Sequence, residues 1–300
     1  MATLPNPLPS LTSHGLDLPP GSLVDTTADG PWHEPLFWYG NTAAAPGDFA
    51  ALRATGRPVG LLPVLIDEGP RQEPPSAWDL APEHVSYPGD HDAEEVLLSY
   101  WEPYADDELG DEGAASDATA WSEVASGSEG MSGSDDTSEA GVPAGSRSTP
   151  EWPGLAPVPV ACLGDPDRLA AGLADVIGSA YLEEDGTGLR PALVPARRSA
   201  DIPAAIGWSG PVNHENDVAR LCAVLRSWED RFDIRIVMLG FDTLTVSVGR
   251  PPTTLAEARA VAAEHYAFCP DNIDQNPPYN LDGYAEKHLM NRDCWTFWWD

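Results

Sequence analysis

Residues 217–300 constrain the fold more than any other part of this sequence, because they predict one element after another. Apolar side chains first recur at i, i+3, i+4, i+7, i+10 and i+14, which are Val218, Leu221, Cys222, Leu225, Trp228 and Phe232. This spacing follows the 3.6-residue period of an α-helix and predicts a helix with one continuous apolar face. Asn216 or Asp217 can cap its first turn with a side-chain oxygen.

Two short strands are predicted directly after this helix. Residues 234–241 are apolar on both faces from their middle onward. In residues 243–248, Leu244, Val246 and Val248 face one way and alternate with Thr and Ser. The short link at residues 240–242 favours an antiparallel hairpin whose second strand is solvated on one side.

Two more helices and an aromatic strand are predicted before the C-terminus. Thr254 and Glu257 form a capping-box pattern, so a helix is expected to begin there and to end before Pro270. A shorter helix is predicted over residues 281–290. Residues 294–299 predict a closing strand, with three aromatic side chains on one face: Trp295, Phe297 and Trp299.

The first hundred residues give weaker signals. Residues 1–30 show no sustained period and predict extended chain with a few apolar anchors, Leu16, Leu18, Leu23 and Val24. An aromatic strand is predicted at residues 35–39, a short helix at 47–54 and a buried strand at 59–66. Because proline lacks an N–H group, Pro63 predicts an edge position or a bulge for the last of these strands.

Residues 102–150 consist mainly of Asp, Glu, Ser, Gly, Ala and Thr. Such a segment cannot bury enough apolar surface to offset the ordering of its backbone, which costs about 1–2 kcal/mol per residue. We therefore predict an acidic disordered insertion that acts as a spacer. The alternative is a tail that captures a basic partner.

Regular structure is expected to return after this insertion. Residues 158–163 predict a strand, and Asp165-Pro166 predicts the start of a helix with proline in its first turn. A further strand is predicted at residues 191–194. Residues 202–208 predict a short helical turn that closes at Gly207.

The charge of the chain restricts the partners that it can bind. The formal net charge is -32, from 16 basic and 48 acidic residues, and the acidic surplus extends over the whole sequence. Such a surface repels phosphate backbones and anionic lipids, so neither nucleic acid nor membrane is expected as a partner. Simple solubility or a basic protein partner explains the charge better.

The cysteines and the N-terminus indicate the compartment. Cys162, Cys222, Cys269 and Cys294 are widely separated and form no CxxC pair. The first residues show neither the basic nor the apolar region of a signal peptide, and no stretch reaches the roughly 20 apolar residues of a membrane span. We therefore expect a cytoplasmic protein with reduced thiols and without a disulfide framework.

Together these patterns predict an α/β or α+β fold, with a mainly antiparallel sheet flanked by helices and a disordered acidic insertion. We divide the chain into an extended segment (residues 1–30), an N-terminal α/β part (31–101), the insertion (102–150) and a C-terminal α/β domain (151–300). The N-terminal strands are expected to join the same body as the C-terminal ones.

Three runs of residues, in this order, resemble a known family. They are residues 225–232 (LRSWEDRF), residues 263–271 (AEHYAFCPD) and the closing residues 295–300 (WTFWWD). The runs resemble the bacterial family called domain of unknown function 4253, over about residues 191–300. The resemblance implies a domain boundary, but it implies no activity, cofactor or site residue.

The densest polar cluster of the sequence contains Glu264, His265, Cys269 and Asp271. His265 and Cys269 are four residues apart, so they share one face of the predicted helix. The spacing suits two zinc ligands, with Asp271 or Glu264 as a third, or a Cys/His nucleophile pair. A thiol at a helix C-terminus has its pKa raised by the helix dipole, however, which argues against the nucleophile. The simplest interpretation is a packed Cys269 and a His265 with one buried hydrogen bond.

Two further groups are candidates for binding. In the first, Trp228 continues the apolar stripe, while Glu229 and Arg231 form either an ion pair or a recognition edge. In the second, the aromatic C-terminus either joins the core or lines a ligand groove. Trp298 lies on the opposite face from its aromatic neighbours, so its exposure distinguishes the two possibilities.

The sequence contains no GxGxxG or Walker A loop, no HExxH and no GxSxG motif. We therefore expect an interaction module without catalytic activity and without a cofactor, such as an adaptor or immunity-like protein that binds a basic protein partner. The alternative is a hydrolase or metal-dependent enzyme that uses His265, Cys269, Asp271 and Glu264.

Overall fold

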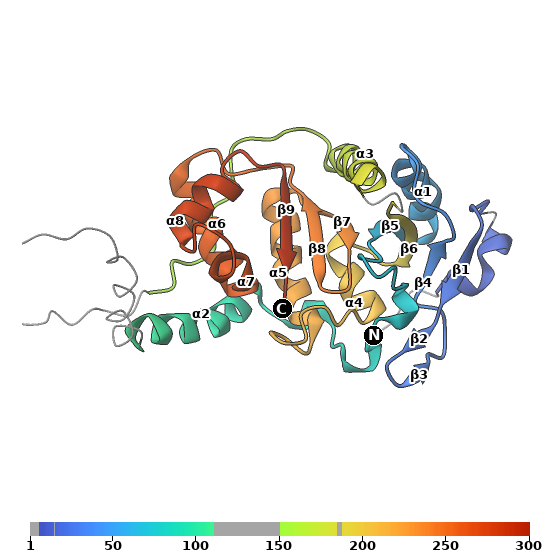
Figure 1. Cartoon of the computed structure of the whole chain (residues 1–300), viewed down its shortest axis with the longest axis horizontal. Helices are drawn as coiled ribbons and strands as arrows, with labels where there is room; N and C mark the ends of the chain where they lie inside the picture. The colour runs from blue at the N-terminus through green and yellow to red at the C-terminus, as the bar shows by residue number, and fades with distance from the viewer. Residues whose placement is uncertain (1–5, 15, 111–150, 185–187) are drawn as a thin grey trace, which may run out of the picture.

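The computed structural model describes residues 6–14, 16–110, 151–184 and 188–300, and its centre is one seven-stranded sheet (Figure 1). The strand order is β1-β4-β6-β5-β7-β8-β9, and only β5 and β7 run parallel. The strands are β1 (Gly21–Val24), β4 (Phe37–Gly40), β5 (Leu61–Ile66), β6 (Arg190–Pro195), β7 (Arg235–Leu239), β8 (Thr243–Ser247) and β9 (Cys294–Trp298). A separate two-stranded ribbon joins β2 (Thr26–Thr27) to β3 (Gly30–Pro31). The predicted α+β class with a mainly antiparallel sheet is confirmed.

The sheet interleaves strands from both ends of the chain. β5 lies between β6 and β7, although β6 follows it by more than a hundred residues. Its ladder with β6 runs from the Leu61–Pro195 pair to the Ile66–Arg190 pair, whereas its parallel pairing with β7 involves only Leu65 and Ile66. The centre of the sheet therefore combines one strand from the N-terminal part of the chain with two from the C-terminal part.

Helices cover both faces of the sheet. The first face packs against α1 (Asp48–Gly56) and α3 (Pro166–Glu184), with Leu65 of β5 at the contact (Figure 1). Val64 and Ile66 point to the opposite face, where the larger core is built. The helices that contribute to that core include α2 (Ala93–Gly110), α4 (Ile202–Ile206), α5 (Val218–Phe232) and α6 (Leu255–Phe268).

The helix ends follow from local chemistry. The Asp217 carboxylate accepts a hydrogen bond from the Ala219 N–H group, and Asp233 ends α5 in a left-handed conformation. Thr254 and Glu257 form the predicted capping box at the start of α6. α4 ends at Gly207, whose φ of 66° and close approach to the Pro82 backbone leave no room for a side chain.

The C-terminal elements follow the predicted order, but the prediction that β8 is solvated on one side is wrong, because Thr245 and Ser247 are buried. After α6 comes α7 (Asp271–Asp274), which was not predicted. The predicted shorter helix over residues 281–290 is formed by α8 (Leu281–Tyr284) and one π-helical turn (Ala285–Leu289). β9 then closes the sheet as an edge strand, with the Trp295, Phe297 and Trp299 side chains buried as expected. Among the described helices, none is long and apolar enough to cross a membrane.

Short helical turns complete the described chain. Six of its connections contain a 3-10 turn: Leu8–His14, Arg57–Val59, Pro75–Ala77, Pro82–His84, Pro88–Asp90 and Ser199–Asp201. Five of the six begin with proline or have it at the second position, where a missing N–H group costs no hydrogen bond.

Two predictions about the outer segments are wrong. Residues 158–163 form no strand, because Pro157 and Pro159 remove backbone donors and Val160 is 94% exposed. Residues 1–30 are more than extended chain, since β1 is an edge strand and Leu8 is buried. Helix α2 runs to Gly110 and so includes the first nine residues of the predicted insertion, 102–110, whose disorder stays a prediction. The rest of that predicted insertion, residues 111–150, lies outside the described residues.

The prediction for Pro63 is also wrong. The proline occupies an interior strand, because β5 has neighbours on both sides. It pairs with Leu193 on β6, while the ladder with β7 begins only at Leu65. Pro63 thus lies before the parallel ladder, where its missing N–H group interrupts no pairing with β7.

Candidate functional site

Glu264 and Arg231 form a buried ion pair between α6 and α5. The Glu264 side chain is fully buried, and both of its oxygens accept from the Arg231 guanidinium, at 2.8 and 2.6 Å. The Trp228 indole N–H donates to the same carboxylate at 2.7 Å. The backbone of Ala156 completes the cluster, because its N–H donates to Glu264 and its C=O accepts from Arg231. The ion pair is therefore fully hydrogen-bonded, and it holds the segment before α3 against the core.

His265 is sealed inside the aromatic core. Its Nδ1 atom lies 3.1 Å from the Tyr284 hydroxyl, and its ring contacts Trp228, Trp295 and Phe297. Burial lowers the pKa of His265 to about 3. The imidazole is consequently neutral at physiological pH, and its Nε2 atom has no hydrogen-bond partner among the described residues.

Cys269 packs at the end of α6 against β9. Its thiol donates to the Trp298 carbonyl at 2.9 Å, and burial raises its pKa to about 12. A thiol with so high a pKa is protonated at neutral pH and is a poor nucleophile or metal ligand. The interpretation of Cys269 as a packed core residue agrees with this geometry.

The remaining sequence-predicted residues lie apart from this core. Asp271 faces the C-terminus, where its carboxylate accepts from the Asp300 N–H group. Glu229 does not pair with Arg231; it lies 3.4 Å from Arg198 and 3.5 Å from Arg235. Across the described parts of the chain, no three His, Cys, Asp or Glu side chains converge to hold a metal ion.

Asn272 covers the free edge of β9. Its side-chain N–H donates to the Thr296 carbonyl at 2.7 Å, and its oxygen accepts from the Trp298 N–H at 3.1 Å. These two backbone groups point away from β8, so the amide takes the place of one residue of a further strand. Asn272 also donates to the Tyr284 hydroxyl at 3.3 Å. This contact blocks strand addition at the centre of the edge.

A cavity of about 590 Å³ opens beside this edge, and the sequence analysis missed it. Trp298 is half-buried and lines this cavity. It is the one candidate residue that the structure places at an opening. The other lining residues come from α7, α8, the π turn, β9 and the loops between them: Asn272, Asn276, Pro277, Tyr284, Lys287, His288, Arg292, Cys294, Trp295 and Thr296. One available signal was Lys287, the single lysine of an acidic chain.

Comparisons with known proteins identify the C-terminal part of the chain only. No curated protein and no solved structure matches the sequence significantly. Residues 190–300 begin at the first residue of β6 and include the buried ion pair, the aromatic core and the cavity beside β9. Residues 190–300 match the family model described as domain of unknown function DUF4253, which confirms the resemblance given by the sequence motifs.

Proposed function

We propose that this protein is a cytoplasmic interaction module without catalytic activity, and that an acidic surface of the fold binds a basic protein partner. The single observation that carries the proposal is the distribution of ion pairs. Buried or half-buried carboxylates pair with most of the described arginines, as in Arg226–Asp201, Arg231–Glu264 and Arg235–Asp167. The acidic surplus therefore remains on the surface.

Within the described chain, one local acidic surplus lies in the loops before α2 and in its first turn. The acidic loop surface consists of four exposed side chains, Asp79, Glu83, Asp90 and Glu95. Within the described chain, none of the four forms an ion pair with Lys or Arg. The sequence also has no Lys or Arg between Arg71 and Arg147. Unpaired carboxylates at this density attract a complementary cationic surface.

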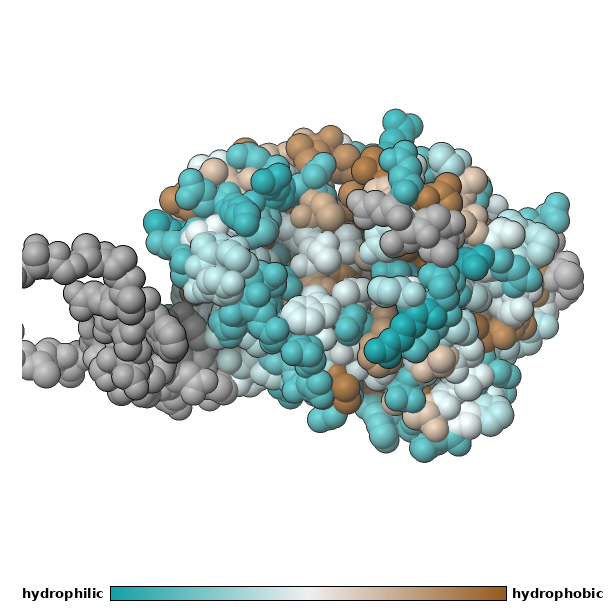
Figure 2. Space-filling model, viewed as in Figure 1, coloured by the Kyte–Doolittle hydropathy of each residue, from teal (hydrophilic) through white to brown (hydrophobic). Residues whose placement is uncertain are grey.

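The character of the surface supports binding through charge rather than through apolar contact. On the face seen in Figure 2, hydrophilic residues predominate and apolar ones form small separate patches. Surface carboxylates mainly accelerate encounter and select the partner, and salt screens them over about 8–10 Å. Binding at such a surface is therefore expected to weaken as ionic strength rises.

A charge-neutralisation comparison tests the proposal. The full chain captures a partner from lysate of its host, and the affinity of the purified pair is then measured. The variant Asp79→Asn/Glu83→Gln/Asp90→Asn/Glu95→Gln is expected to weaken that affinity at least about tenfold, because four attractive charges are removed. Raising the salt from about 0.1 to 0.5 M is expected to have a similar effect on the unmodified chain.

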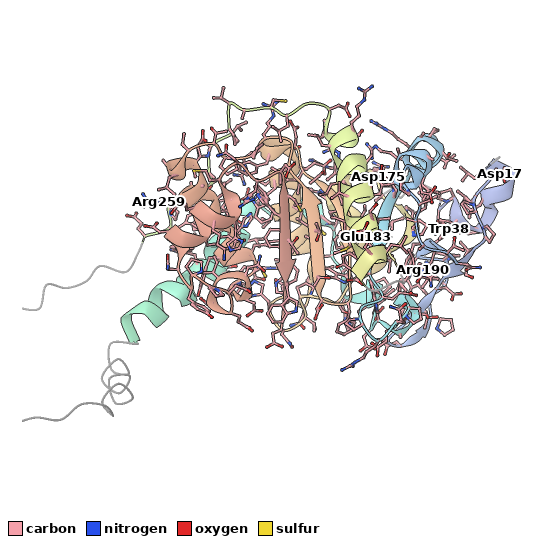
Figure 3. All side chains as sticks on the ribbon, turned by 45° about the horizontal axis from the view of Figure 1, so that its top comes forward. Asp17, Trp38, Asp175, Glu183, Arg190 and Arg259 are labelled. Atoms are coloured by element: carbon pink, nitrogen blue, oxygen red, sulfur yellow. The ribbon has the colours of Figure 1, made fainter. Side chains whose placement is uncertain are left out.

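The matched control removes the same number of charges elsewhere. Asp17→Asn/Glu183→Gln/Glu286→Gln/Asp293→Asn changes four exposed residues outside the loops before α2; of these, Asp17 precedes β1 and Glu183 lies in the last turn of α3 (Figure 3). This control is expected to bind normally. Equal loss in both variants, or binding that does not depend on salt, would contradict the proposed surface.

A further inference from the structure

The cavity beside β9 differs in charge from the rest of the molecule. Lys287 and Arg292 line it, and within the described residues neither cation forms an ion pair with a carboxylate. Their polar contacts are to backbone oxygens: Lys287 Nζ lies 3.5 Å from the Pro277 carbonyl, and Arg292 Nε lies 3.2 Å from the Lys287 carbonyl. Both guanidinium NH2 groups of Arg292 thus remain available.

The lining of the cavity contains no Asp or Glu among the residues that the structure describes. The local field is positive as a result, in a chain whose formal net charge is -32. The pKa of His288 is lowered, first by burial and then by the positive charges of Lys287 and Arg292. A positively charged cavity favours an anionic ligand. The ligand of this cavity therefore differs from the basic protein partner proposed for the acidic loop surface.

The walls of the cavity are aromatic. Trp298 is half-buried, and Trp295 and Tyr284 are buried behind it. Trp295 is 2% exposed, and its indole N–H has no acceptor within the described chain. Flat aromatic walls with a few polar groups are typical of small-molecule sites, and the volume of about 590 Å³ is in their range.

The edge of β9 argues against an extended peptide as the occupant. A peptide that added to the sheet would need the Thr296 carbonyl and the Trp298 N–H group, and Asn272 already binds both. A compact ligand needs neither group. The site therefore suits a small molecule better than an added strand.

We infer that the cavity beside β9 is a binding site for a small aromatic anion, in which Lys287 and Arg292 hold a phosphate or carboxylate and Trp298 packs on the ring. This inference is independent of the proposed protein partner, because it concerns another surface and the opposite charge. Arg292 contacts the anion through its two free NH2 groups, and Lys287 contacts it as a point charge.

Titration calorimetry on the full chain tests the inference with four probes. Phenyl phosphate and benzoate carry the ring with either anion, inorganic phosphate lacks the ring, and benzyl alcohol lacks the charge. We expect one-to-one saturable binding of phenyl phosphate or of benzoate, and the comparison of the two identifies the preferred anion. Inorganic phosphate and benzyl alcohol are each expected to bind at least about tenfold more weakly, since each loses one kind of contact.

Substitutions locate the binding. Lys287→Gln/Arg292→Gln removes the two cavity cations and is expected to weaken the binding of the aromatic anion at least about tenfold. The control Arg168→Gln/Arg197→Gln removes two exposed arginines elsewhere that form no ion pair in the described chain, and it is expected to bind normally. Trp298→Leu keeps the two cations. This variant is expected to bind phenyl phosphate more weakly and inorganic phosphate with unchanged affinity.

Two results would overturn the inference. One is the absence of saturable binding of both aromatic anions at concentrations up to about 10 mM, which corresponds to an affinity too weak for a built site. The other is equal weakening by the cavity variant and the control variant, which would show a general charge effect. Circular dichroism of each variant verifies that its fold is unchanged.

Discussion

Strand β9 borders two regions that contain similar polar groups in opposite circumstances. On the core side, Glu264, Arg231 and His265 are sealed, and the two charges neutralise each other. On the edge side, Lys287 and Arg292 are exposed and lack a carboxylate partner within the described residues. The comparison teaches that chemical type does not identify a site: the cluster with the most reactive residue types is structural, and the plainer pair of cations faces a cavity.

The largest effect is expected from breaking the core side of this comparison. Glu264→Ala leaves the Arg231 charge buried without compensation and leaves the Trp228 and Ala156 N–H groups without an acceptor. Breaking a buried pair in this way costs about 3–5 kcal/mol of unfolding free energy. Urea denaturation of the full chain measures the loss.

A double substitution distinguishes charge from packing in the same experiment. Glu264→Leu/Arg231→Met removes both charges together and is expected to be less destabilising than Glu264→Ala, because no uncompensated charge remains. If the double variant is the less stable of the two, the ion pair contributes more than its own desolvation cost.

A smaller effect comes from the pH dependence of His265. Burial lowers the pKa of this group from 6.5 to about 3, so between these values the unfolded chain binds a proton that the folded chain does not. The contribution to stability is complete above pH 6.5 and is lost as pH falls, at up to about 1.4 kcal/mol per pH unit. Between about pH 7 and pH 4.5 the loss is about 2–3 kcal/mol.

The variant His265→Phe isolates this contribution, since phenylalanine cannot take up a proton in either state. Between about pH 7 and pH 4.5, the unfolding free energy of this variant is expected to fall by about 2–3 kcal/mol less than that of the unmodified chain. Denaturation curves at several pH values measure both slopes. Parallel slopes would mean that His265 is protonated in the folded protein, which would place it in contact with water.

The smallest effect concerns the edge side. Asn272→Ala leaves the Thr296 carbonyl and the Trp298 N–H without their partner, at a cost of about 1–2 kcal/mol. Hydrogen exchange at the Trp298 amide is expected to accelerate about tenfold or more, because that amide loses its acceptor. The control Asn276→Ala removes an exposed amide nearby and is expected to leave both measurements unchanged. Unchanged exchange in Asn272→Ala would show that another group covers the edge.

Elements with their own local pattern could be predicted from the sequence. The apolar stripe from Val218 to Phe232 became α5, the Thr254–Glu257 pattern became the capping box of α6, and the alternation of Trp295, Phe297 and Trp299 became the buried face of β9. In each case neighbouring residues determine the structure, so periodicity is sufficient.

Features that depend on distant residues could not be predicted. Pro63 has the sequence signature of an edge strand, yet its place is fixed by β6 and β7, which come much later in the chain. No helix was predicted over residues 93–101, yet α2 buries Val96, Leu97 and Trp101 there. The cavity beside β9 needs Asn272, Lys287 and Trp298 from three different elements, and no local spacing connects them.

The strand order has a consequence for how this chain can be divided. Residues 190–300 contribute β6, β7, β8 and β9, but β6 and β7 do not pair with each other, because β5 from the N-terminal part lies between them. Cut out alone, this region would have a slot one strand wide through the middle of its sheet. A backbone cut within residues 111–150 disrupts the sheet less, because the ladders on both sides of β5 stay in place. We expect the two fragments to remain together as one noncovalent complex.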